Sequence, residues 1–461
     1  MLHPSEIMNN KIAAIAIVAV LIIAGVSIAV IYSNSSGDED SPSLASDTRL
    51  VIYGNANGDD YLDDNDVMYL QNVLNGKNEE NKFCDTNCDG RIDQEDVNFL
   101  KAILDGTASE IYYENLNGNI ASVRQPVKTI GADYWPIMYG IMAIGATDIL
   151  TWVDSGIYNS FSTNSIYRGL DVSNIKNFGS GFHEGYDFET IMSTHLDAIV
   201  CGSEDIYFVG IEDKFSDESK IDMIRLPFWE GGNVSSAVLT LAYLLGDSEY
   251  IENAHKFVDF QDRIQKTIDN CISKVDNKDT VLVTYLGSST ESSLEVEVEC
   301  RGSGSYECSI IAGMNNLASY LNQEGKLSSD TMYYNTDQEY VIGKNPDWVI
   351  ILGSGSGLFP NEDKLKTSYA VGAKYLNTTN AAKNNQIAVS GSGITSGTMQ
   401  MNTALYIACT VYSDAFSDVD ADAFLQEYID NFTSVNKGLN STDSKYLKAD
   451  STGFLYLPSK V

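Results

Sequence analysis

Residues 247–274 read DSEYIENAHKFVDFQDRIQKTIDNCISK. The apolar residues of this stretch recur close to every 3.6 positions, which is the spacing of one buried face on an α-helix. They are Ile251, Ala254, Phe257, Val258, Ile264, Ile268, Cys271 and Ile272. Polar and charged residues fill the positions between them. The pattern therefore predicts a single long amphipathic helix in the middle of the chain.

Short apolar runs alternate with helical stretches on both sides of this helix, which is typical of α/β folds. Before it we expect strands at 127–132, 148–153, 196–202 and 222–228 and helices at 135–146 and 235–246. After it we expect strands at 280–287, 347–353 and 384–393 and a helix from about Thr398 to Val411. The predicted domains are an N-lobe (126–246), a bridging helix (247–279), a C-lobe (280–435) and a C-terminal tail (436–461).

The N-terminal segment has the composition of a membrane anchor. Residues 12–32 read IAAIAIVAVLIIAGVSIAVIY without a charge, and a helix of that length spans ~31 Å, close to the thickness of a bilayer core. We expect a single-pass anchor in the cell membrane, with residues 1–11 cytoplasmic, 33–48 a flexible linker and the bulk of the chain extracytoplasmic. A cleaved signal peptide is the alternative.

Charge and cysteine content narrow the function classes. The chain carries 29 basic and 64 acidic residues, a net charge of −35, which excludes nucleic acid as an expected partner. Seven cysteines are an odd number and so cannot form a complete disulfide framework. The sequence leaves open whether the pairs Cys84/Cys88 and Cys300/Cys308 form disulfide bridges or remain free thiols.

Two acidic segments share one pattern. NANGDDYLDDND spans 55–66 and DTNCDGRIDQED spans 85–96, and an apolar helical stretch follows each. Oxygen-bearing residues stand at the positions of a calcium loop. We expect two Ca²⁺ sites, the first weaker and strained because Asn55 and Asp60 stand where the second has Asp85 and Gly90. The expected ligands are Asn55, Asn57, Asp59, Tyr61, Asp63 and Asp66, and Asp85, Asn87, Asp89, Arg91, Asp93 and Asp96.

This duplicated loop and helix resembles the dockerin type I module over residues 49–107. The resemblance implies a small α module, and the dense negative charge favours a fold that forms with calcium. It also implies a cohesin-domain protein as a partner. A calcium-stabilised spacer that binds no partner is the alternative.

One sequence motif, which we call the repeated phrase, occurs twice. It consists of an acidic residue, an aliphatic helical turn and a strand. The copies are YDFETIMSTHLDAIVCG (186–202) and DQEYVIGKNPDWVIILG (337–353). With the order lobe, helix, lobe, they resemble the class III substrate-binding proteins of ABC importers over roughly residues 126–435. The resemblance implies a two-lobed periplasmic-binding-protein fold that delivers a metal chelate or corrinoid (iron-siderophore, haem or cobalamin) to an ABC permease and ATPase.

The same resemblance implies that Glu189 and Glu339 dock on the permease. The alternative for both is a solvated carboxylate at a helix start, where the helix dipole favours it. Aromatic residues also gather just after predicted strands, where a two-lobed α/β protein holds its ligand. We expect ligand contacts from Tyr134, Trp135, Trp152, Tyr158, Trp229 and Tyr285.

Aromatic faces suit a macrocycle or an aryl chelate, whereas ordinary rim packing is the alternative for each ring. His183 with Glu184 is a further candidate for an axial metal ligand. No nucleophile elbow of the GxSxG type occurs, and we expect a binding protein rather than an enzyme. The alternative function is a dockerin-bearing cell-surface component that binds a carbohydrate or cell-wall ligand in a cohesin-scaffolded complex.

Overall fold

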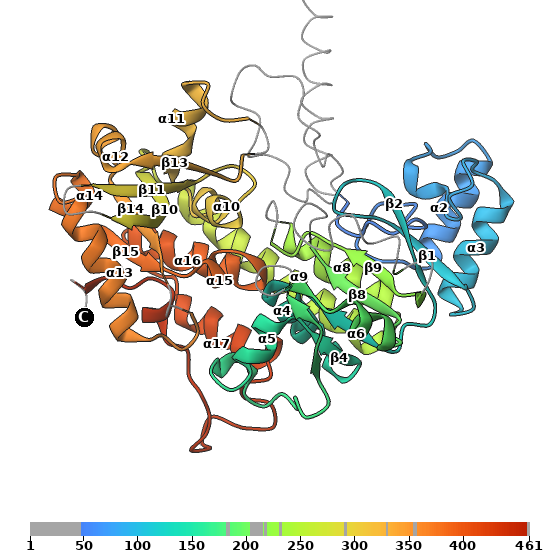
Figure 1. The fold of residues 1–461 in the computed structure, drawn as a ribbon. Coiled ribbons are helices and arrows are strands. Elements are labelled where there is room, and N and C mark those ends of the chain that lie inside the picture. Colours follow the sequence, from blue (N-terminus) through green and yellow to red (C-terminus); the bar gives the residue numbers. More distant parts are fainter. Residues whose placement is uncertain are drawn as a thin grey trace, which may run out of the picture. The chain divides into compact units, whose positions relative to one another are not determined.

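The computed structural model describes residues 48–180, 185–202, 215, 219–229, 233–289, 293–328, 331–353 and 357–458. From Leu50 onward the chain forms one compact unit, which holds two α/β lobes and a small N-terminal module (Figure 1). The predicted anchor at 12–32 and the pair His183 and Glu184 lie outside the described residues. Among the helices that are described, none is both long enough and apolar enough to cross a membrane.

The N-lobe contains a parallel five-stranded sheet in the order β5-β4-β3-β8-β9. Every residue of β3 and β8 is buried, as expected for parallel strands that are covered on both faces. The strands are β3 Ile130–Ala132, β4 Leu150–Val153, β5 Lys176–Asn177, β8 Ala198–Cys201 and β9 Asp222–Arg225, and β6 Gly179–Ser180 pairs with β7 Gly185–Tyr186. The helices are α4 Trp135–Ile144, α5 Ser155–Ser160, α6 Phe188–Ser193 and α8 Val234–Leu245, with 3-10 turns η2 Ala146–Asp148 and η3 Ser165–Tyr167.

The C-lobe contains a mixed sheet in the order β13-β11-β10-β14-β15, with β12 paired to β10. β10, β14 and β15 are parallel, whereas β11 and β13 are antiparallel to their neighbours. The strands are β10 Thr280–Ser289, β11 Leu294–Glu299, β12 Asn315–Asn316, β13 Tyr333–Asp337, β14 Trp348–Leu352 and β15 Ile387–Ser390. The helices are α10 Gly304–Ile311, α11 Ala318–Gln323, α12 Gln338–Lys344, α13 Glu362–Tyr375, α14 Asn380–Lys383, α15 Ser392–Thr395, α16 Gln400–Val411 and α17 Ala421–Phe432, with 3-10 turns η5 Gly397–Met399 and η6 Ser451–Gly453.

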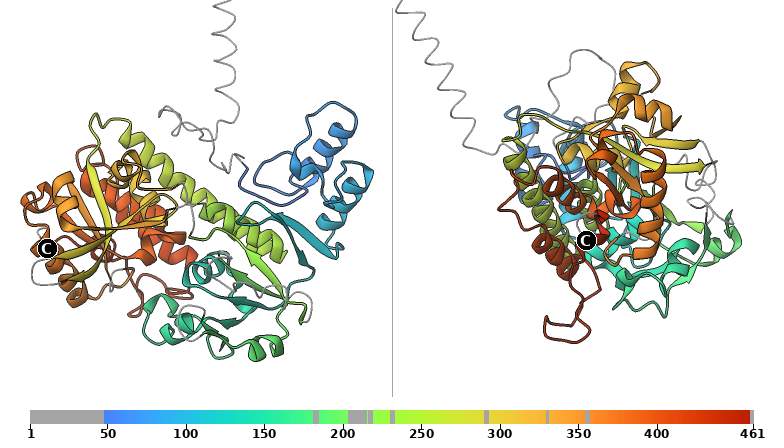
Figure 2. Two further views of the ribbon diagram at one scale, coloured as in Figure 1. Left: turned by 45° about the horizontal axis from the view of Figure 1, so that its top comes forward. Right: turned by 90° about the vertical axis from the view of Figure 1, so that its left-hand side faces the viewer.

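One continuous helix joins the lobes. Helix α9 runs over Ser248–Ile272, 25 residues, or ~37 Å, and Figure 2 shows it passing from one lobe to the other. The Asp247 side chain caps its start by accepting from the Glu249 N–H at 2.8 Å. The helix packs on α4 and α8 in the N-lobe and on α16 from the C-lobe, so its predicted apolar stripe is buried against both halves.

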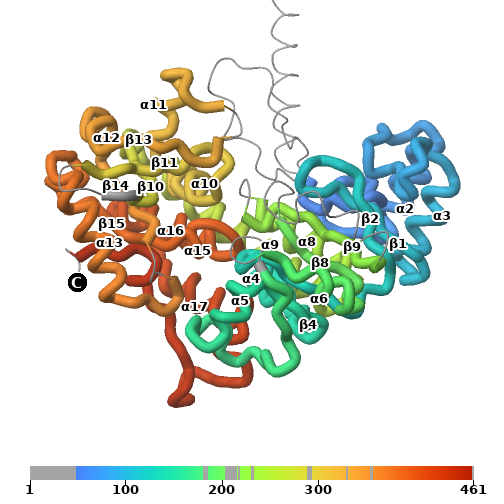
Figure 3. The backbone as a smooth tube through the Cα atoms, viewed as in Figure 1, coloured from blue at the N-terminus to red at the C-terminus, as the bar shows by residue number. Residues whose placement is uncertain are grey.

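The C-terminal segment is part of the folded unit as far as residue 458, the last one described, and does not form the tail predicted at 436–461. After α17, whose Phe432 ring packs 5.4 Å from Phe257 of α9, the chain returns to the C-lobe (Figure 3). There Tyr456 bridges Val389 of β15 in an antiparallel fashion, and Phe454 is fully buried. Buried apolar side chains, among them Phe454 and Tyr456, hold this segment in place.

The N-terminal module contains α2 Asp64–Leu74, the 3-10 turn η1 Lys82–Cys84 and α3 Gln94–Leu104. An antiparallel hairpin, β1 Glu110–Glu114 and β2 Ile120–Arg124, then connects it to the N-lobe. The hairpin fills the stretch 108–125, for which the sequence predicted no element. All seven cysteines are free thiols, so neither pair considered from the sequence is bridged.

Candidate functional site: the cleft between the lobes

A cavity of about 680 Å³ lies between the two lobes. Its N-lobe side consists of residues that follow β3 and β4, and its C-lobe side of residues that follow β14 and β15. The carboxyl ends of the parallel strands of both sheets therefore face this space, as is usual for ligand sites in α/β proteins. The cavity has the size of a pocket for a small molecule or cofactor.

The N-lobe side of the cavity is aromatic. Tyr134 and Trp135 begin helix α4, and their ring centroids are 5.2 Å apart. Trp135 lies 5.4 Å from Tyr139, one helical turn further on, and Tyr139 lies 6.2 Å from Tyr167. Burial raises the pKa of Tyr139 to about 12, and it raises the pKa of Tyr167 well above its usual value. These phenols are therefore neutral, and the wall offers ring faces and hydroxyl groups.

The C-lobe side is rich in glycine. Gly353 and Gly357 follow β14, and Gly391 and Gly393 follow β15. A Cβ atom on Gly353 would lie 2.7 Å from the Val389 side chain, so no larger residue fits there without a shift. A Cβ on Gly393 would come within 3.9 Å of the Trp135 ring. Backbone therefore forms part of the C-lobe side, together with the side chains of Leu358, Phe359, Ile394 and Met399.

The six aromatic residues predicted to contact a ligand separate into two groups. Tyr134 and Trp135 line the cavity, and the other four are not among its described lining residues. Trp229 packs edge-on behind Tyr134 at 5.8 Å, and Trp152 lies beneath the Lys176 ammonium at 5.3 Å. Tyr158 packs on Phe161 at 6.0 Å. Tyr285 is 36% exposed, and its side chain hydrogen-bonds that of Ser392, which lines the cavity.

The sequence prediction missed several lining residues, among them Tyr139, Asn164, Tyr167, Phe359 and Met399. Tyr139 stands four residues after Trp135, on the same face of a helix, and that spacing could have identified it. The other four reach the cavity from loops or helix ends that approach it only in the folded chain, and the sequence contains no local signal for them.

The two predicted docking carboxylates occupy equivalent positions. Glu189 and Glu339 stand in the first turns of α6 and α12, and both are exposed. The residue two before each, Asp187 or Asp337, caps its helix by accepting from the backbone N–H of Thr190 at 3.0 Å or of Tyr340 at 2.9 Å. Glu189 and Glu339 therefore stand at matching helix starts, one in each lobe.

The two predicted calcium loops share a backbone arrangement. The last carboxylate of each loop, Asp66 or Asp96, is buried. It accepts hydrogen bonds from the backbone N–H groups at loop positions 3 and 9. The distances are 3.1 and 2.9 Å in the first loop and 3.2 and 2.8 Å in the second. Burial raises the pKa of Asp66 to about 6, and it raises the pKa of Asp96 in the same way.

The donor chemistry of the loops fits a calcium ion. The Asn55 side-chain oxygen at loop position 1 is buried and has no hydrogen-bond partner, which leaves an oxygen available for a cation. Calcium prefers the carboxylate, amide and carbonyl oxygens present here. In the described part of the chain, no group of three or more His, Cys, Asp or Glu side chains is arranged to hold a metal ion. The carboxylates of these loops accept hydrogen bonds from nearby N–H groups instead.

The strain expected at Asp60 is absent. The second loop takes positive φ at Cys88 (55°) and Gly90 (87°), whereas the first does so at Gly58 (73°) and Asp60 is not among the described residues with positive φ. The Asn55 amide nitrogen donates to the Asp59 carbonyl at 2.7 Å, so the first loop closes by a different route. The first loop therefore differs from the second in backbone conformation and is not a strained copy of it.

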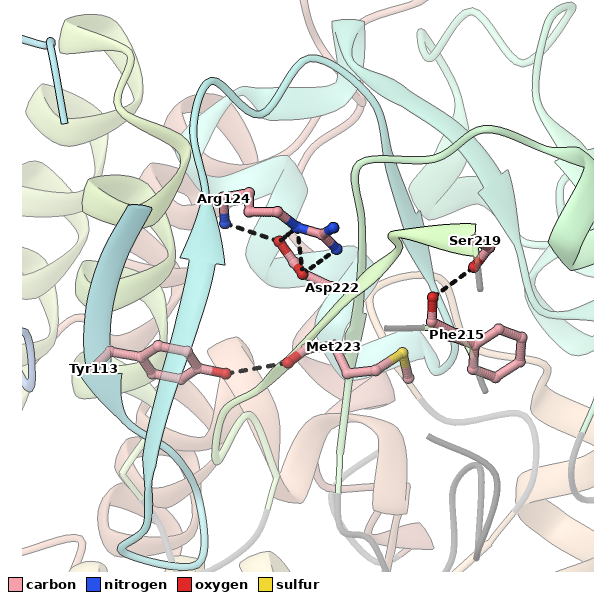
Figure 4. A network of polar contacts seen from close by, with 6 residues as sticks. All are labelled: Tyr113, Arg124, Phe215, Ser219, Asp222 and Met223. Atoms are coloured by element: carbon pink, nitrogen blue, oxygen red, sulfur yellow. Dashed lines mark hydrogen bonds and ion pairs between the residues drawn. The ribbon is translucent and has the colours of Figure 1, made fainter. Parts of the chain in front are cut away.

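The module and hairpin are built into the N-lobe. Figure 4 shows Tyr113 of β1 against β9, where its hydroxyl donates to the Met223 carbonyl at 3.3 Å. The same hydroxyl accepts from the Arg225 N–H at 3.0 Å. The Arg124 guanidinium binds the Asp222 carboxylate, with Nε 3.0 Å from Oδ1. β9 is the last strand of the N-lobe sheet, and the hairpin thereby covers an edge that would otherwise carry unpaired groups.

A second contact joins the first of the two predicted calcium loops to the bridging helix. The Tyr61 ring stacks on the His255 ring of α9 at 4.2 Å and an angle of 12°. The Leu62 N–H donates to the Tyr243 hydroxyl at 3.3 Å, and that hydroxyl is 3.1 Å from His255 Nε2. Tyr61 stands at the loop position whose carbonyl binds calcium in loops of this spacing. Through these contacts the loop touches both the N-lobe and the bridging helix α9.

Comparison with solved structures agrees with this architecture. A TroA-like periplasmic binding protein, FepB, from Veillonella parvula is 18% identical, with a TM-score of 0.54 over 70% of this chain and 95% of that one. A periplasmic solute-binding protein from the same organism is 15% identical, with a TM-score of 0.54 over 74% and 97% of the two chains.

A third solved structure, the molybdate-binding protein MolA from Haemophilus influenzae, is 12% identical with a TM-score of 0.52 over 70% and 97%. The fold is that of the TroA-like periplasmic binding proteins. At these identities the likeness concerns the fold alone. No protein-family model matches the sequence, and no curated protein matches it either.

Proposed function

We propose that this chain captures a metal chelate or corrinoid (iron-siderophore, haem or cobalamin type) outside the cell membrane and delivers it to an ABC permease with its ATPase. The observation that carries the proposal is the cavity of about 680 Å³ between two lobes, with an aromatic wall on one side and glycines and apolar side chains on the other. Ring faces suit planar or aryl-bearing ligands. The solved neighbours include a molybdate-binding protein and a Helicobacter pylori protein, CeuE, whose structure was solved as a Ni–His complex.

Binding in this fold involves modest motion of the lobes. The continuous helix α9 contacts helices from both lobes, and a helix without an internal break resists wide hinge bending. The ligand enters the cleft, displaces water from the rings of Trp135 and Tyr139, and is held between the lobes. Transport itself requires the permease and ATPase, to which the loaded protein presents a surface.

That surface includes Glu189 and Glu339 in the proposed complex. Both carboxylates are exposed in the first turn of a helix, at equivalent positions of the repeated phrase. Charges at an interface rim steer association more than they fix affinity. Reversing both charges tests the docking role, because it should slow transport and leave ligand affinity in solution unchanged.

We further propose that residues 49–107 bind two calcium ions, and that the anchor at 12–32 holds the chain at the membrane. The support for calcium is the oxygen-only donor set and the free Asn55 oxygen. Tethering to a cohesin-domain protein is a separate proposal, tested by a pull-down with a cohesin domain in calcium and in chelator.

Native mass spectrometry of the purified full chain tests the transport proposal. The chain is incubated with a panel of ferric siderophores, haem, corrinoids and oligosaccharides, and the mass of the complex identifies the ligand. We expect one chelate or corrinoid per chain. Binding of an oligosaccharide instead would favour the cell-surface carbohydrate function, and no adduct with any chelate or corrinoid would refute the proposal.

A further inference from the structure

The N-terminal module shares its hydrophobic core with the N-lobe. One cluster of buried side chains includes Leu62 of the first predicted calcium loop and Val67 of α2, together with Leu244 of α8 and Phe257 of α9. A module tethered by a linker would instead bury a core of its own and make few contacts across the boundary. The module is therefore built into the N-lobe.

The segment that enters the first predicted loop is held by the N-lobe. The buried Thr240 hydroxyl of α8 accepts from the Val51 N–H at 3.3 Å, and the Val51 carbonyl accepts from the Glu114 N–H of β1 at 2.9 Å. The amide nitrogen of Asn55, at loop position 1, donates to the Leu50 carbonyl at 2.8 Å. The first expected calcium ligand is thus positioned by a segment that is fixed to α8.

The middle of the same loop contacts both α8 and α9, which pack on each other. The Tyr61 ring stacks on the His255 ring of α9, and the Leu62 N–H donates to the Tyr243 hydroxyl of α8. That hydroxyl is also 3.1 Å from His255 Nε2. Loop positions 7 and 8 are therefore held by side chains from two helices, and the shape of the loop depends on those helices staying together.

We propose that calcium binding at the first loop and folding of the N-lobe are linked through the contacts that Tyr243 and His255 make with the loop. The inference rests on the calcium binding proposed above, and it gives the module a role within the binding protein, as a brace on α8 and the start of α9. Such linkage is reciprocal. Contacts that hold the loop in its folded shape raise its calcium affinity, and calcium binding stabilises the same contacts.

Calcium titrations by calorimetry test the linkage from the side of the loop. The full chain carries Asp85→Ala in every case, which disables the second site so that the heat reports on the first. In this background Tyr243→Phe removes the acceptor of the Leu62 N–H and should lower calcium affinity at least about fivefold, the lower end of measured couplings. Asn270→Ala, at an exposed position near the end of α9, is the neutral control and should keep the affinity unchanged.

Two substitutions at His255 separate the stacking from general damage to the helix. His255→Ala removes the stacked ring and should weaken calcium binding several-fold, whereas His255→Phe keeps a ring and should restore most of the loss. Circular dichroism without calcium verifies that each variant is folded. Unchanged calcium affinity in both Tyr243→Phe and His255→Ala would overturn the linkage and leave calcium binding itself intact.

Hydrogen exchange of the wild-type chain tests the linkage from the side of the lobe. Calcium should slow amide exchange in α8 and the first turns of α9 as well as within residues 49–107, and Tyr243→Phe should reduce the slowing in both helices. Slowing confined to residues 49–107 would overturn the inference, because the module would then respond to calcium by itself. If the wild type takes up no calcium, the calcium proposal fails and the linkage fails with it.

Discussion

Asp347 and Thr280 form a reciprocal ring of hydrogen bonds at the base of the C-lobe sheet. The Asp347 carboxylate accepts from the Thr280 N–H at 3.0 Å and from its hydroxyl at 2.8 Å, and that hydroxyl accepts from the Asp347 N–H at 3.1 Å. Asp197 and Thr129 repeat the arrangement in the N-lobe, with distances of 2.9, 3.1 and 3.1 Å. In each lobe these hydrogen bonds join the residue just before one strand, β14 or β8, to the beginning of the neighbouring strand, β10 or β3.

Replacing Asp347 with alanine should destabilise the C-lobe. The substitution leaves the Thr280 N–H without its acceptor, and hydrogen bonds to a charged group contribute roughly 1.5–3 kcal/mol each. We expect the free energy of unfolding, measured in urea, to fall by about that amount. Asp414→Ala, at an exposed C-lobe position, is the control and should stay within ~0.5 kcal/mol of wild type. Equal effects of the two substitutions would show that the ring contributes nothing.

The hairpin contact gives a second stability prediction. Tyr113→Phe removes one buried hydroxyl and leaves both the Met223 carbonyl and the Arg225 N–H without that partner, which costs about 1–3 kcal/mol. The loss should appear as a lower unfolding midpoint in urea. Tyr333→Phe removes a hydroxyl from a residue that is 59% exposed and should have no measurable effect. A Tyr113→Phe protein as stable as wild type would mean that the hairpin is not held to β9 by this contact.

Calcium should stabilise the module. At a free concentration 100 times the dissociation constant, binding adds ~2.7 kcal/mol to the free energy of unfolding. We expect calcium to raise the melting temperature relative to chelator, and Asp85→Ala to remove most of the second site's share. Asp105→Ala lies beyond the loop at the end of α3 and should keep the full response. An unchanged melting temperature with and without calcium would argue against both sites.

The buried Glu299 carboxyl predicts how stability depends on pH. Burial raises its pKa from 4.5 to about 7, and the side chain is only 6% exposed. Because the folded state binds this proton more tightly than the unfolded state, stability falls as pH rises from about 4.5 to 7, by up to ~3 kcal/mol. Glu299→Gln should remove this slope and be more stable than wild type at pH 8. Parallel pH profiles for the two proteins would contradict the assignment.

The sequence predicted the fold well where periodicity is strong. The stripe at 247–274 appears as α9 over Ser248–Ile272, and the two copies of the repeated phrase lead into β8 and β14. The N-lobe copy has His195 and Leu196 where the C-lobe has Asn345 and Pro346, yet His195 and Asn345 take the same left-handed turn, with φ of 55° and 50°. The proline is therefore not required for that geometry.

The sequence predicted the cleft less completely. Trp135 was identified because it follows a strand, but Tyr167 and Phe359 reach the cavity through the packing of distant segments, which no local pattern reveals. The β1–β2 hairpin was missed because it derives its stability from β9, through the Tyr113 and Arg124 contacts, rather than from its own sequence. Tertiary contacts likewise hold Phe454 in what had been predicted as a tail.

The most direct test of the central claim is the affinity of Trp135→Ala for whichever chelate or corrinoid binds the full chain, measured by calorimetry beside wild type and Tyr158→Ala. Trp135 lines the cavity and Tyr158 does not. We predict one ligand per chain, a loss of about 2 kcal/mol or roughly thirtyfold in affinity for Trp135→Ala, and wild-type affinity for Tyr158→Ala. Wild-type affinity in Trp135→Ala would contradict the account, because the ligand would then bind outside the cleft.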